Sequence, residues 1–133
     1  MFLPNWSGGR DAAVDITVIN PLQSSLVART ATEPGYALIY QYNKKWQKYV
    51  QICHENGIVF HPIPLETMGG FGGSSINLIK RLGQSLGRAT GQDETETTQH
   101  LFGRLSIQLM KGNCSLLINR IPNFPDPSVD GVN

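Results

Sequence analysis

The stretch AVDITVIN, residues 13–20, decides the fold that we expect for this chain. It is rich in β-branched residues, alternates at period two and stops at Pro21, which is typical of a β-strand. Alternate residues of a strand face opposite sides. One predicted face carries Val14, Ile16 and Val18, and the other carries Asp15, Thr17 and Ile19. The carboxylate of Asp15 therefore sits in an otherwise apolar strand.

The segments around this strand predict a hairpin-like start and a following helix. Residues 1–13 are rich in turn formers, and residues 21–35 are mostly loop with a short helical turn. Residues 36–56 predict a helix that ends at Asn56-Gly57. Its apolar stripe is spaced for a helix and consists of Leu38, Tyr42, Tyr49 and Ile52.

The second half of the chain predicts one more strand and then helices. Residues 58–66 form the strand, and Pro62 and Pro64 favour an edge of the sheet. The remaining expected segments are a Gly-rich loop at 68–75 with serines that cap the next helix, helices at 75–88 and 96–119, and an acidic connection at 91–99. We expect a small α+β (α/β) domain over 1–121, with a core at 1–70, a helical extension at 71–121 and a flexible tail at 122–133.

Composition excludes several classes of protein. The chain has 133 residues, 40% of them hydrophobic, and a formal net charge of +1, which fits one packed domain and excludes a strongly basic nucleic-acid binder. It has no apolar run of the roughly 20 residues that a membrane-spanning helix needs, and no signal-peptide pattern. Two cysteines, Cys53 and Cys114, are too few for a disulfide scaffold or a zinc site of four cysteines. We expect an intracellular protein of the nucleus or cytoplasm.

Lys45 is the residue that gives Asp15 a possible partner. At about 100° per residue it falls within the apolar stripe of the 36–56 helix and points toward the sheet. Lys48 lies at the edge of that stripe, and Lys44 lies further toward solvent. A lysine aimed at a core either extends its ammonium to water or meets a carboxylate. We therefore expect Asp15 and Lys45 to share a polar cleft between strand and helix, although a solvated Asp15 on an edge strand is about equally compatible with the sequence.

An acid on a strand and a lysine on the next helix suit cleavage of phosphodiesters. A carboxylate can hold Mg²⁺, which polarises phosphate, and a lysine can stabilise the charge that develops on phosphorus. Aromatic residues between the lysines, Trp46 and Tyr49 among them, suit stacking on bases. The sequence thus predicts DNA contacts by Lys44, Lys45, Trp46 and Lys48.

These residues resemble a known family. AVDITV, then Lys45-x-x-Lys48-Tyr49, then GIVFHPIPLETMGG is similar to the restriction-like endonuclease domain of non-LTR retrotransposon proteins, of the PD-(D/E)xK superfamily. The resemblance covers roughly residues 1–70. It implies a restriction-endonuclease-like sheet, a Mg²⁺ cofactor, a DNA substrate and a larger parent polypeptide that carries a reverse transcriptase. It also implies catalytic roles for Asp15, Lys45, Lys48 and Tyr49.

One part of the family pattern is missing. The family's Pro-Asp, which supplies the first metal carboxylate, would fall about a dozen residues before Asp15, at or just before Met1. We therefore expect a domain truncated at its N-terminus that is weakly active or inactive. Glu66, at the end of the second strand, is a candidate additional metal ligand, although a solvated glutamate is the commoner role at such a position.

Other polar residues predict structural roles. His54, His61 and His100 lack zinc-site spacing, and GGFGG (69–73) lacks the lysine of a phosphate-binding loop. Cys114 is expected in the core, and the acidic residues before the last helix favour its dipole. Three functions stay open: a Mg²⁺-dependent DNA endonuclease, a non-catalytic nucleic-acid-binding or interaction module, and an unrelated structural α/β protein in which Asp15 and Lys45 form an ion pair.

Overall fold

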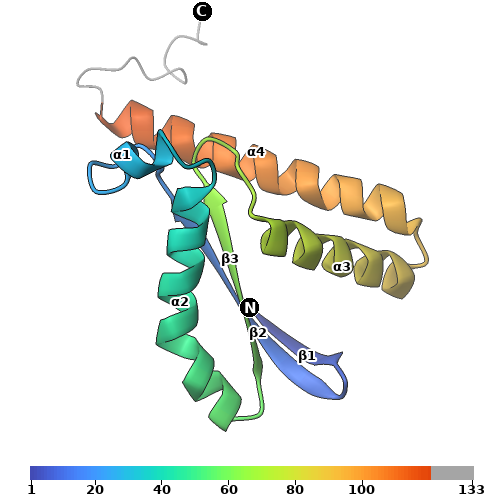
Figure 1. Ribbon diagram of the computed structural model, residues 1–133. Helices are drawn as coiled ribbons and strands as arrows, with labels where there is room; N and C mark the ends of the chain where they lie inside the picture. The colour runs from blue at the N-terminus through green and yellow to red at the C-terminus, as the bar shows by residue number, and fades with distance from the viewer. Residues whose placement is uncertain (121–133) are drawn as a thin grey trace, which may run out of the picture.

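The computed structural model describes residues 1–120 and has an α+β fold (Figure 1). Its elements, in chain order, are β1 (Phe2–Ser7), β2 (Arg10–Ile19), α1 (Val27–Thr30), α2 (Tyr36–Glu55), β3 (Val59–Glu66), α3 (Gly73–Thr90) and α4 (Glu94–Arg120). The predicted fold class, a small sheet flanked by helices with a helical C-terminal part, is confirmed. The expected tail at 122–133 lies outside the described residues.

The sheet has the strand order β1-β2-β3, with β1 antiparallel and β3 parallel to β2. The predicted hairpin-like start is confirmed, because β1 and β2 are joined at Gly8 and Gly9. Both glycines have positive φ angles, of 57° and 77°, which favour glycine in a tight turn. Strand β2 begins at Arg10, earlier than the expected residue 13, because its pairing with β1 extends it.

Strand β3 lies at an edge of the sheet, as Pro62 and Pro64 predict. Peptide groups of a strand point alternately to its two sides, so both prolines direct their missing N–H away from β2. The carbonyl of Pro64 accepts a hydrogen bond of 3.2 Å from Ser75 Oγ, and Glu66 N donates to Gly70 O at 2.9 Å. The Gly-rich loop and the start of α3 therefore cover the end of this edge.

Helix α2 covers one face of the sheet through aromatic contacts with β3 (Figure 1). The ring of Phe60 is buried, and its centroid lies 6.3 Å from that of Trp46 and 5.6 Å from that of Tyr49. Ile52, which the sequence places in the apolar stripe, is instead 59% exposed. Cys53, in the last turn of α2, is partly buried. After this turn the chain folds back, and the backbone N–H groups of Asn56 and Ile58 both donate to the carbonyl of Cys53.

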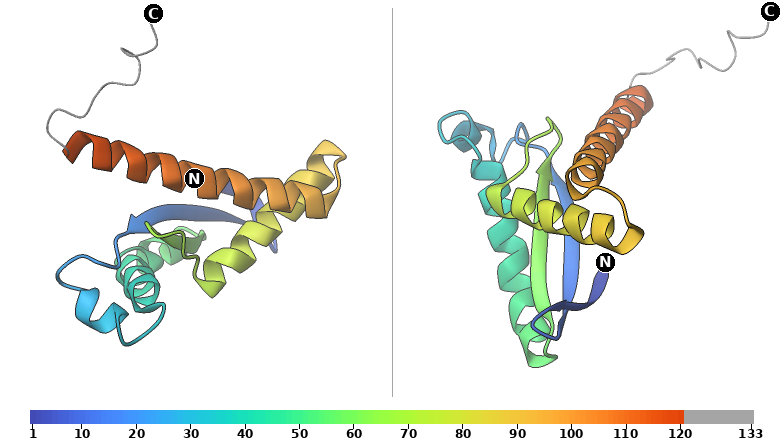
Figure 2. Two further views of the ribbon diagram at one scale, coloured as in Figure 1. Left: turned by 90° about the horizontal axis from the view of Figure 1, so that it is seen from above. Right: turned by 90° about the vertical axis from the view of Figure 1, so that its right-hand side faces the viewer.

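Helices α3 and α4 lie on the opposite face of the sheet (Figure 2). The main core forms there and consists of Val14, Ile63, Leu65, Leu78 and Ile79. Residues of α4 that pack against this core are only partly buried. The alternation predicted for β2 is confirmed: Val14 faces this core, while Ile19 joins a second buried cluster on the α1 and α2 side.

Helices α3 and α4 pack closely because glycines of α3 face α4. A Cβ added at Gly83 would lie 2.6 Å from the Cα of Thr98, and one added at Gly87 would lie 2.9 Å from the Cα of Glu94. Helix α4 begins at Glu94, before the expected residue 96, because the carboxylate of Asp93 accepts a hydrogen bond of 2.8 Å from Glu96 N. Within residues 1–120, no helix combines the length and the apolar character needed to cross a membrane.

Two expectations for this half of the chain are wrong. Among the described residues, no side chain caps α3; Ser75 is fully buried and ties α3 to Pro64 of β3 instead. Cys114 is exposed, because α4 extends past the sheet and only Thr97 of this helix is buried. The apolar residues next to Cys114 in the sequence are therefore exposed in the folded chain rather than packed in the core.

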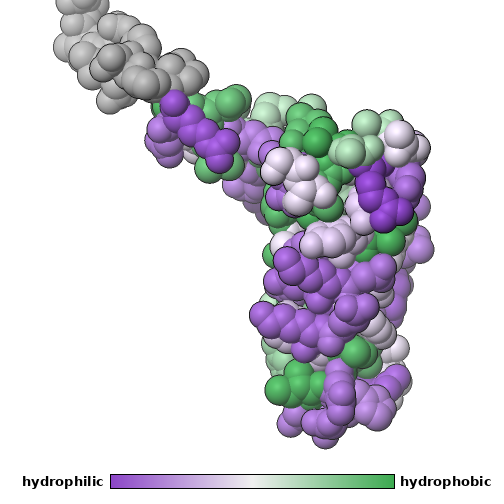
Figure 3. Space-filling view, turned by 60° about the vertical axis from the view of Figure 1, so that its left-hand side comes forward, coloured by the Kyte–Doolittle hydropathy of each residue, from purple (hydrophilic) through white to green (hydrophobic). Residues whose placement is uncertain are grey.

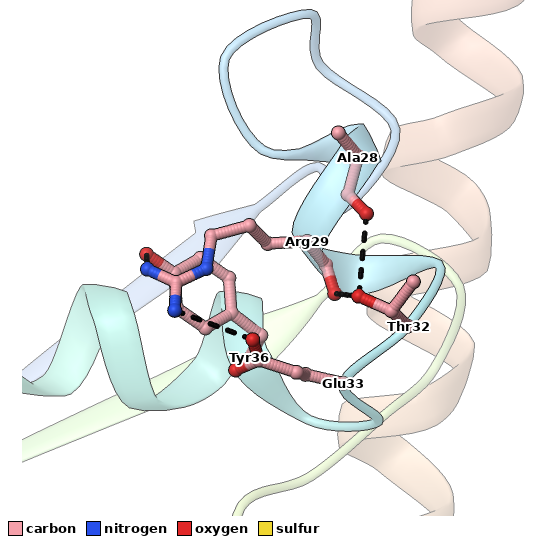
Figure 4. A network of polar contacts seen from close by, with 5 residues as sticks. All are labelled: Ala28, Arg29, Thr32, Glu33 and Tyr36. Atoms are coloured by element: carbon pink, nitrogen blue, oxygen red, sulfur yellow. Dashed lines mark hydrogen bonds and ion pairs between the residues drawn. The ribbon is translucent and has the colours of Figure 1, made fainter.

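A network of exposed polar contacts connects α1 to the first turn of α2 (Figure 4). Arg29 Nη2 lies 3.2 Å from Glu33 Oε1, and Arg29 Nη1 donates to the hydroxyl of Tyr36 at 3.3 Å. The guanidinium also lies 4.5 Å from the centre of the Tyr36 ring. The negative charge of Glu33, with Tyr36, raises the pKa of Arg29. Thr32 closes the turn by donating to the carbonyls of Ala28 and Arg29.

Candidate nucleic-acid site

Asp15 and Lys45 meet between β2 and α2. Lys45 Nζ lies 3.0 Å from Asp15 Oδ2, and the two side chains are 25% and 36% exposed. The helical position of Lys45 and the strand position of Asp15 were both predicted, and their meeting is confirmed. The hydroxyl of Thr17 donates to the same carboxylate oxygen at 3.4 Å, a contact that follows from the two-residue period of β2 but was not predicted.

Tyr49 lies beneath two lysines. The ammonium of Lys48 lies 5.1 Å from the centre of its ring, and that of Lys45 lies 5.7 Å from it. Both distances fall within the roughly 6 Å range of cation–π attraction. The ring of Tyr49 also packs against that of buried Phe60, with the ring centres 5.6 Å apart. Tyr49 therefore lies next to both ammonium groups and against the aromatic ring of β3.

Further lysine and aromatic residues extend the surface along α2. Lys44 and Lys48 are exposed, and the ammonium of Lys44 lies 5.9 Å from the ring centre of Tyr40. Trp46 is 38% exposed and stacks on Tyr42 with a ring separation of 5.9 Å and an angle of 11°. Figure 3, which brings the left-hand side of Figure 1 forward, shows mostly hydrophilic residues with apolar ones between them. We call Lys44, Lys45, Trp46 and Lys48 the α2 basic surface.

Glu66 does not join this site. In the parallel register Asp15 is opposite Pro62, whereas Glu66 is opposite Ile19, four positions further along. At about 3.3 Å per residue the two backbone positions are roughly 13 Å apart. The carboxylate of Glu66 instead lies over Gly70, where an added Cβ would approach it to 2.5 Å. The structure thus brings together Asp15, Lys45, Lys48 and Tyr49 but leaves Glu66 at the far end of the strand.

The residues present do not make a metal centre of the kind that the family resemblance implies. Within residues 1–120, no group of three or more His, Cys, Asp or Glu side chains could hold a metal ion. Among the described residues, Asp15 provides the carboxylate at this site. Its negative charge is already paired with the ammonium of Lys45. Mg²⁺ demands octahedral oxygen coordination and loses its waters reluctantly, so one paired carboxylate is a poor site for it.

The register of β1 identifies the position across from Asp15. Phe2 is opposite Ala13, and Met1 exchanges two backbone hydrogen bonds of 2.7 Å with Val14. One residue placed before Met1 in the same strand would therefore lie opposite Asp15 and on the same face of the sheet.

A second polar group lies on the other face of β3, away from Asp15. Burial, with a smaller contribution from the positive charge of Arg81, lowers the pKa of His61 below its usual 6.5. Among residues 1–120, neither His61 Nε2 nor Trp6 Nε1 has a hydrogen-bond partner, and Arg81 lies 4.8 Å from the centre of the Trp6 ring. His61 contributes to packing on this face, on the opposite side of the sheet from the α2 basic surface.

Comparisons with known proteins add no family to this description. The chain matches no protein-family model, no curated protein and no solved structure.

Proposed function

We propose that this chain is a restriction-like endonuclease domain of mobile-element origin that binds DNA through the α2 basic surface, with little or no cleavage by residues 1–133 themselves. The observation that supports this proposal is the contact between Lys45 Nζ and Asp15 Oδ2 at 3.0 Å, at the junction of β2 and α2. It places one acid and one lysine at a shared, partly exposed position, beside a second lysine held by Tyr49.

The lysines of α2 would bind the phosphate backbone. Lys44 and Lys48 are exposed and can approach phosphates from solvent, and their ammonium groups lie 5.9 and 5.1 Å from the ring centres of Tyr40 and Tyr49. Trp46, exposed by 38%, offers a ring face beside them for a base or a sugar. Phosphate contacts of this kind position a protein on DNA without reading its sequence.

Lys45 and Asp15 would act at the phosphodiester that reaches the junction. A phosphate that approaches Lys45 competes with Asp15 for the ammonium, and Lys45 then neutralises charge on phosphorus. Asp15 supplies one carboxylate, and Thr17 orients it through the 3.4 Å hydrogen bond. Since the described residues do not fit a metal centre, we assign no step to a metal ion.

A second candidate function is DNA binding with no catalysis. The observation that favours it is the pairing of Asp15 with Lys45, because it leaves no free carboxylate at the site among the described residues. The two candidates share the same DNA surface and differ only in cleavage. A first experiment therefore tests binding, and the second, given in the Discussion, tests cleavage.

The binding test measures duplex DNA affinity against salt concentration for the double variant Lys45→Ala, Lys48→Ala. Each lost phosphate contact lowers the slope of log affinity against log salt by about 0.9, so we expect a loss of at least about 0.9 from Lys48, to which Lys45 adds only in part while Asp15 pairs with it. The control is Lys80→Ala, Lys111→Ala, which removes the same charge from exposed positions on α3 and α4. Equal slopes for the two double variants would contradict the proposed surface.

A further inference from the structure

A row of cations and tyrosine rings connects α1 to the outer face of α2. The guanidinium of Arg29 lies 4.5 Å from the centre of the Tyr36 ring and donates to its hydroxyl (Figure 4). The ring of Tyr40 follows, with its centre 6.2 Å from that of Tyr36 and tilted by 32°. The ammonium of Lys44 lies 5.9 Å from the centre of Tyr40. The two tyrosine rings therefore lie side by side, with a cation near each end of the pair.

An open hollow of about 440 Å³ lies beside this row. At about 100° per residue, its lining residues fall on the side of α2 opposite the buried Ala37, Leu38 and Gln41. The lining consists of two tyrosines, an isoleucine, two amides and a lysine: Tyr36, Ile39, Tyr40, Asn43, Lys44 and Gln47. Its volume falls within the roughly 300–1,000 Å³ of sites for small organic groups.

We infer that this hollow binds an unpaired nucleobase of the DNA that the α2 basic surface contacts. The inference rests on the proposed function, and Lys44 belongs to both surfaces. The base stacks on the exposed part of the Tyr40 ring, and the amides of Asn43 and Gln47 hydrogen-bond to its edge. Lys44 binds the phosphate next to this base. The substrate class is therefore DNA with unpaired nucleotides, such as a bulge or a single-stranded flap, rather than a continuous duplex.

The chemistry of the lining favours a nucleobase. The side-chain amides of Asn43 and Gln47 each carry N–H donors and a carbonyl acceptor, the same kinds of group that base edges present. Tyr40 is 38% exposed, and an exposed aromatic ring accepts any base by stacking. Ile39, which is 60% exposed, adds an apolar wall that a base can cover. The positive charge of Lys44 suits the phosphate attached to that base.

Base pairing decides which DNA can use the hollow. In a duplex, each base is stacked on its neighbours and its Watson–Crick edge is paired, so neither the ring face nor that edge is available to α2. Taking a base out of the stack costs free energy, and the cost is least for a base that is already unpaired. A bulge or a flap presents such a base next to a phosphate backbone.

The test compares three fluorescein-labelled DNAs by fluorescence anisotropy at one salt concentration. One is a duplex with a bulge of three unpaired thymidines, the second carries three abasic residues in the same bulge, and the third is fully paired. The two bulges have the same phosphates and differ only in their bases. We expect the thymidine bulge to bind at least about fivefold more tightly than the abasic bulge, because one base stacks on the protein.

Variants of the protein locate the base. Tyr40→Ala should remove most of this preference without changing the salt slope, because it removes a ring but no charge, whereas Tyr40→Phe keeps the ring and should keep the preference. Gln47→Ala should weaken binding of the thymidine bulge about threefold or more through a lost hydrogen bond. Its matched control, Gln84→Ala at an exposed position of α3, should leave binding unchanged. Circular dichroism establishes that each variant is folded.

Three results would overturn the inference: equal binding of the two bulges, an undiminished preference in Tyr40→Ala, or equal effects of Gln47→Ala and Gln84→Ala. If the DNAs still bind with a salt slope that Lys45→Ala, Lys48→Ala lowers, the proposed function stands without the hollow. Absence of binding to all three DNAs would contradict both. Thymidine monophosphate tests a free nucleotide as the occupant. Binding of the mononucleotide as tight as that of the bulged DNA would show a free-nucleotide site and overturn the assignment to DNA.

Discussion

The ammonium of Lys45 lies 3.0 Å from the carboxylate of Asp15, and this pair joins the first long strand of the chain to its first long helix. Both side chains remain partly exposed, so an exposed-type ion pair contributes at most about 1 kcal/mol to folding. Because the pair adds so little to folding stability, it can break to let Lys45 bind another group. In the proposed function, that group is a phosphate.

Replacing Asp15 by Asn should strengthen DNA binding. The substitution removes a negative charge beside the phosphate and releases Lys45 from its partner, so we expect affinity to rise by up to about fivefold, from the free energy of an exposed pair. The salt slope should steepen by about 0.9, as Lys45 becomes a full phosphate contact. Fluorescence anisotropy with labelled duplex measures both. Unchanged affinity and slope would indicate that Asp15 and Lys45 form a structural pair only.

Cleavage should depend on a carboxylate opposite Asp15. Residues 1–133 should show little nicking of supercoiled plasmid in Mg²⁺. An extension that ends in Pro-Asp directly before Met1 places the new carboxylate across from Asp15, given the Met1–Val14 pairing, and should produce Mg²⁺-dependent nicking. The control extension ends in Pro-Asn, which has nearly the same volume without the charge.

Asp15→Asn in the extended protein should abolish that nicking while the thermal unfolding curve stays unchanged within about 1 kcal/mol. Efficient nicking by the unextended chain, to the same extent with and without the Asp15→Asn substitution, would locate the chemistry elsewhere. Binding without nicking in the Pro-Asp protein would favour the second candidate function, DNA binding alone.

Substituting Gly83 by Ala should destabilise the α3–α4 contact. The added Cβ would lie 2.6 Å from the Cα of Thr98, so the two helices would have to separate, at a cost of about 1–3 kcal/mol. Gly112→Ala in α4 is the matched control, because nothing lies within 4 Å of its added Cβ. It should stabilise the fold by about 0.5–1 kcal/mol through helix propensity. Urea unfolding monitored by circular dichroism measures both, and equal shifts would contradict the close packing.

Stability should fall as the pH drops below about 6.5 because of His61. Burial lowers the pKa of His61 in the folded chain, so the unfolded chain binds a proton more readily. Folding stability therefore decreases as the pH falls from about 6.5 toward the lowered pKa, and this loss ends below it. Urea unfolding between pH 5 and pH 7.5 should show this slope, and His61→Leu should remove it. An unchanged slope in the variant would assign it to other groups.

Local patterns determined much of what the sequence predicts correctly. The period-two run at 13–20 and the helical spacing at 36–56 depend on backbone geometry within each segment, so they identify β2, α2 and the directions of Asp15 and Lys45. The alternating prolines of β3 predict an edge strand for the same reason, because each removes a donor at a known side of the strand.

The tertiary structure alone decided which of these residues meet. Glu66 and Asp15 lie on the same face, but the parallel register separates them by four positions, and no local pattern contains that register. Ile16 and Val18 belong to the apolar face as predicted, yet they stay exposed because the described pairing of β2 with the β1 strand stops at Val14 and cavities lie beside them under α4. Periodicity is a property of one segment, whereas register and burial depend on where distant segments pack.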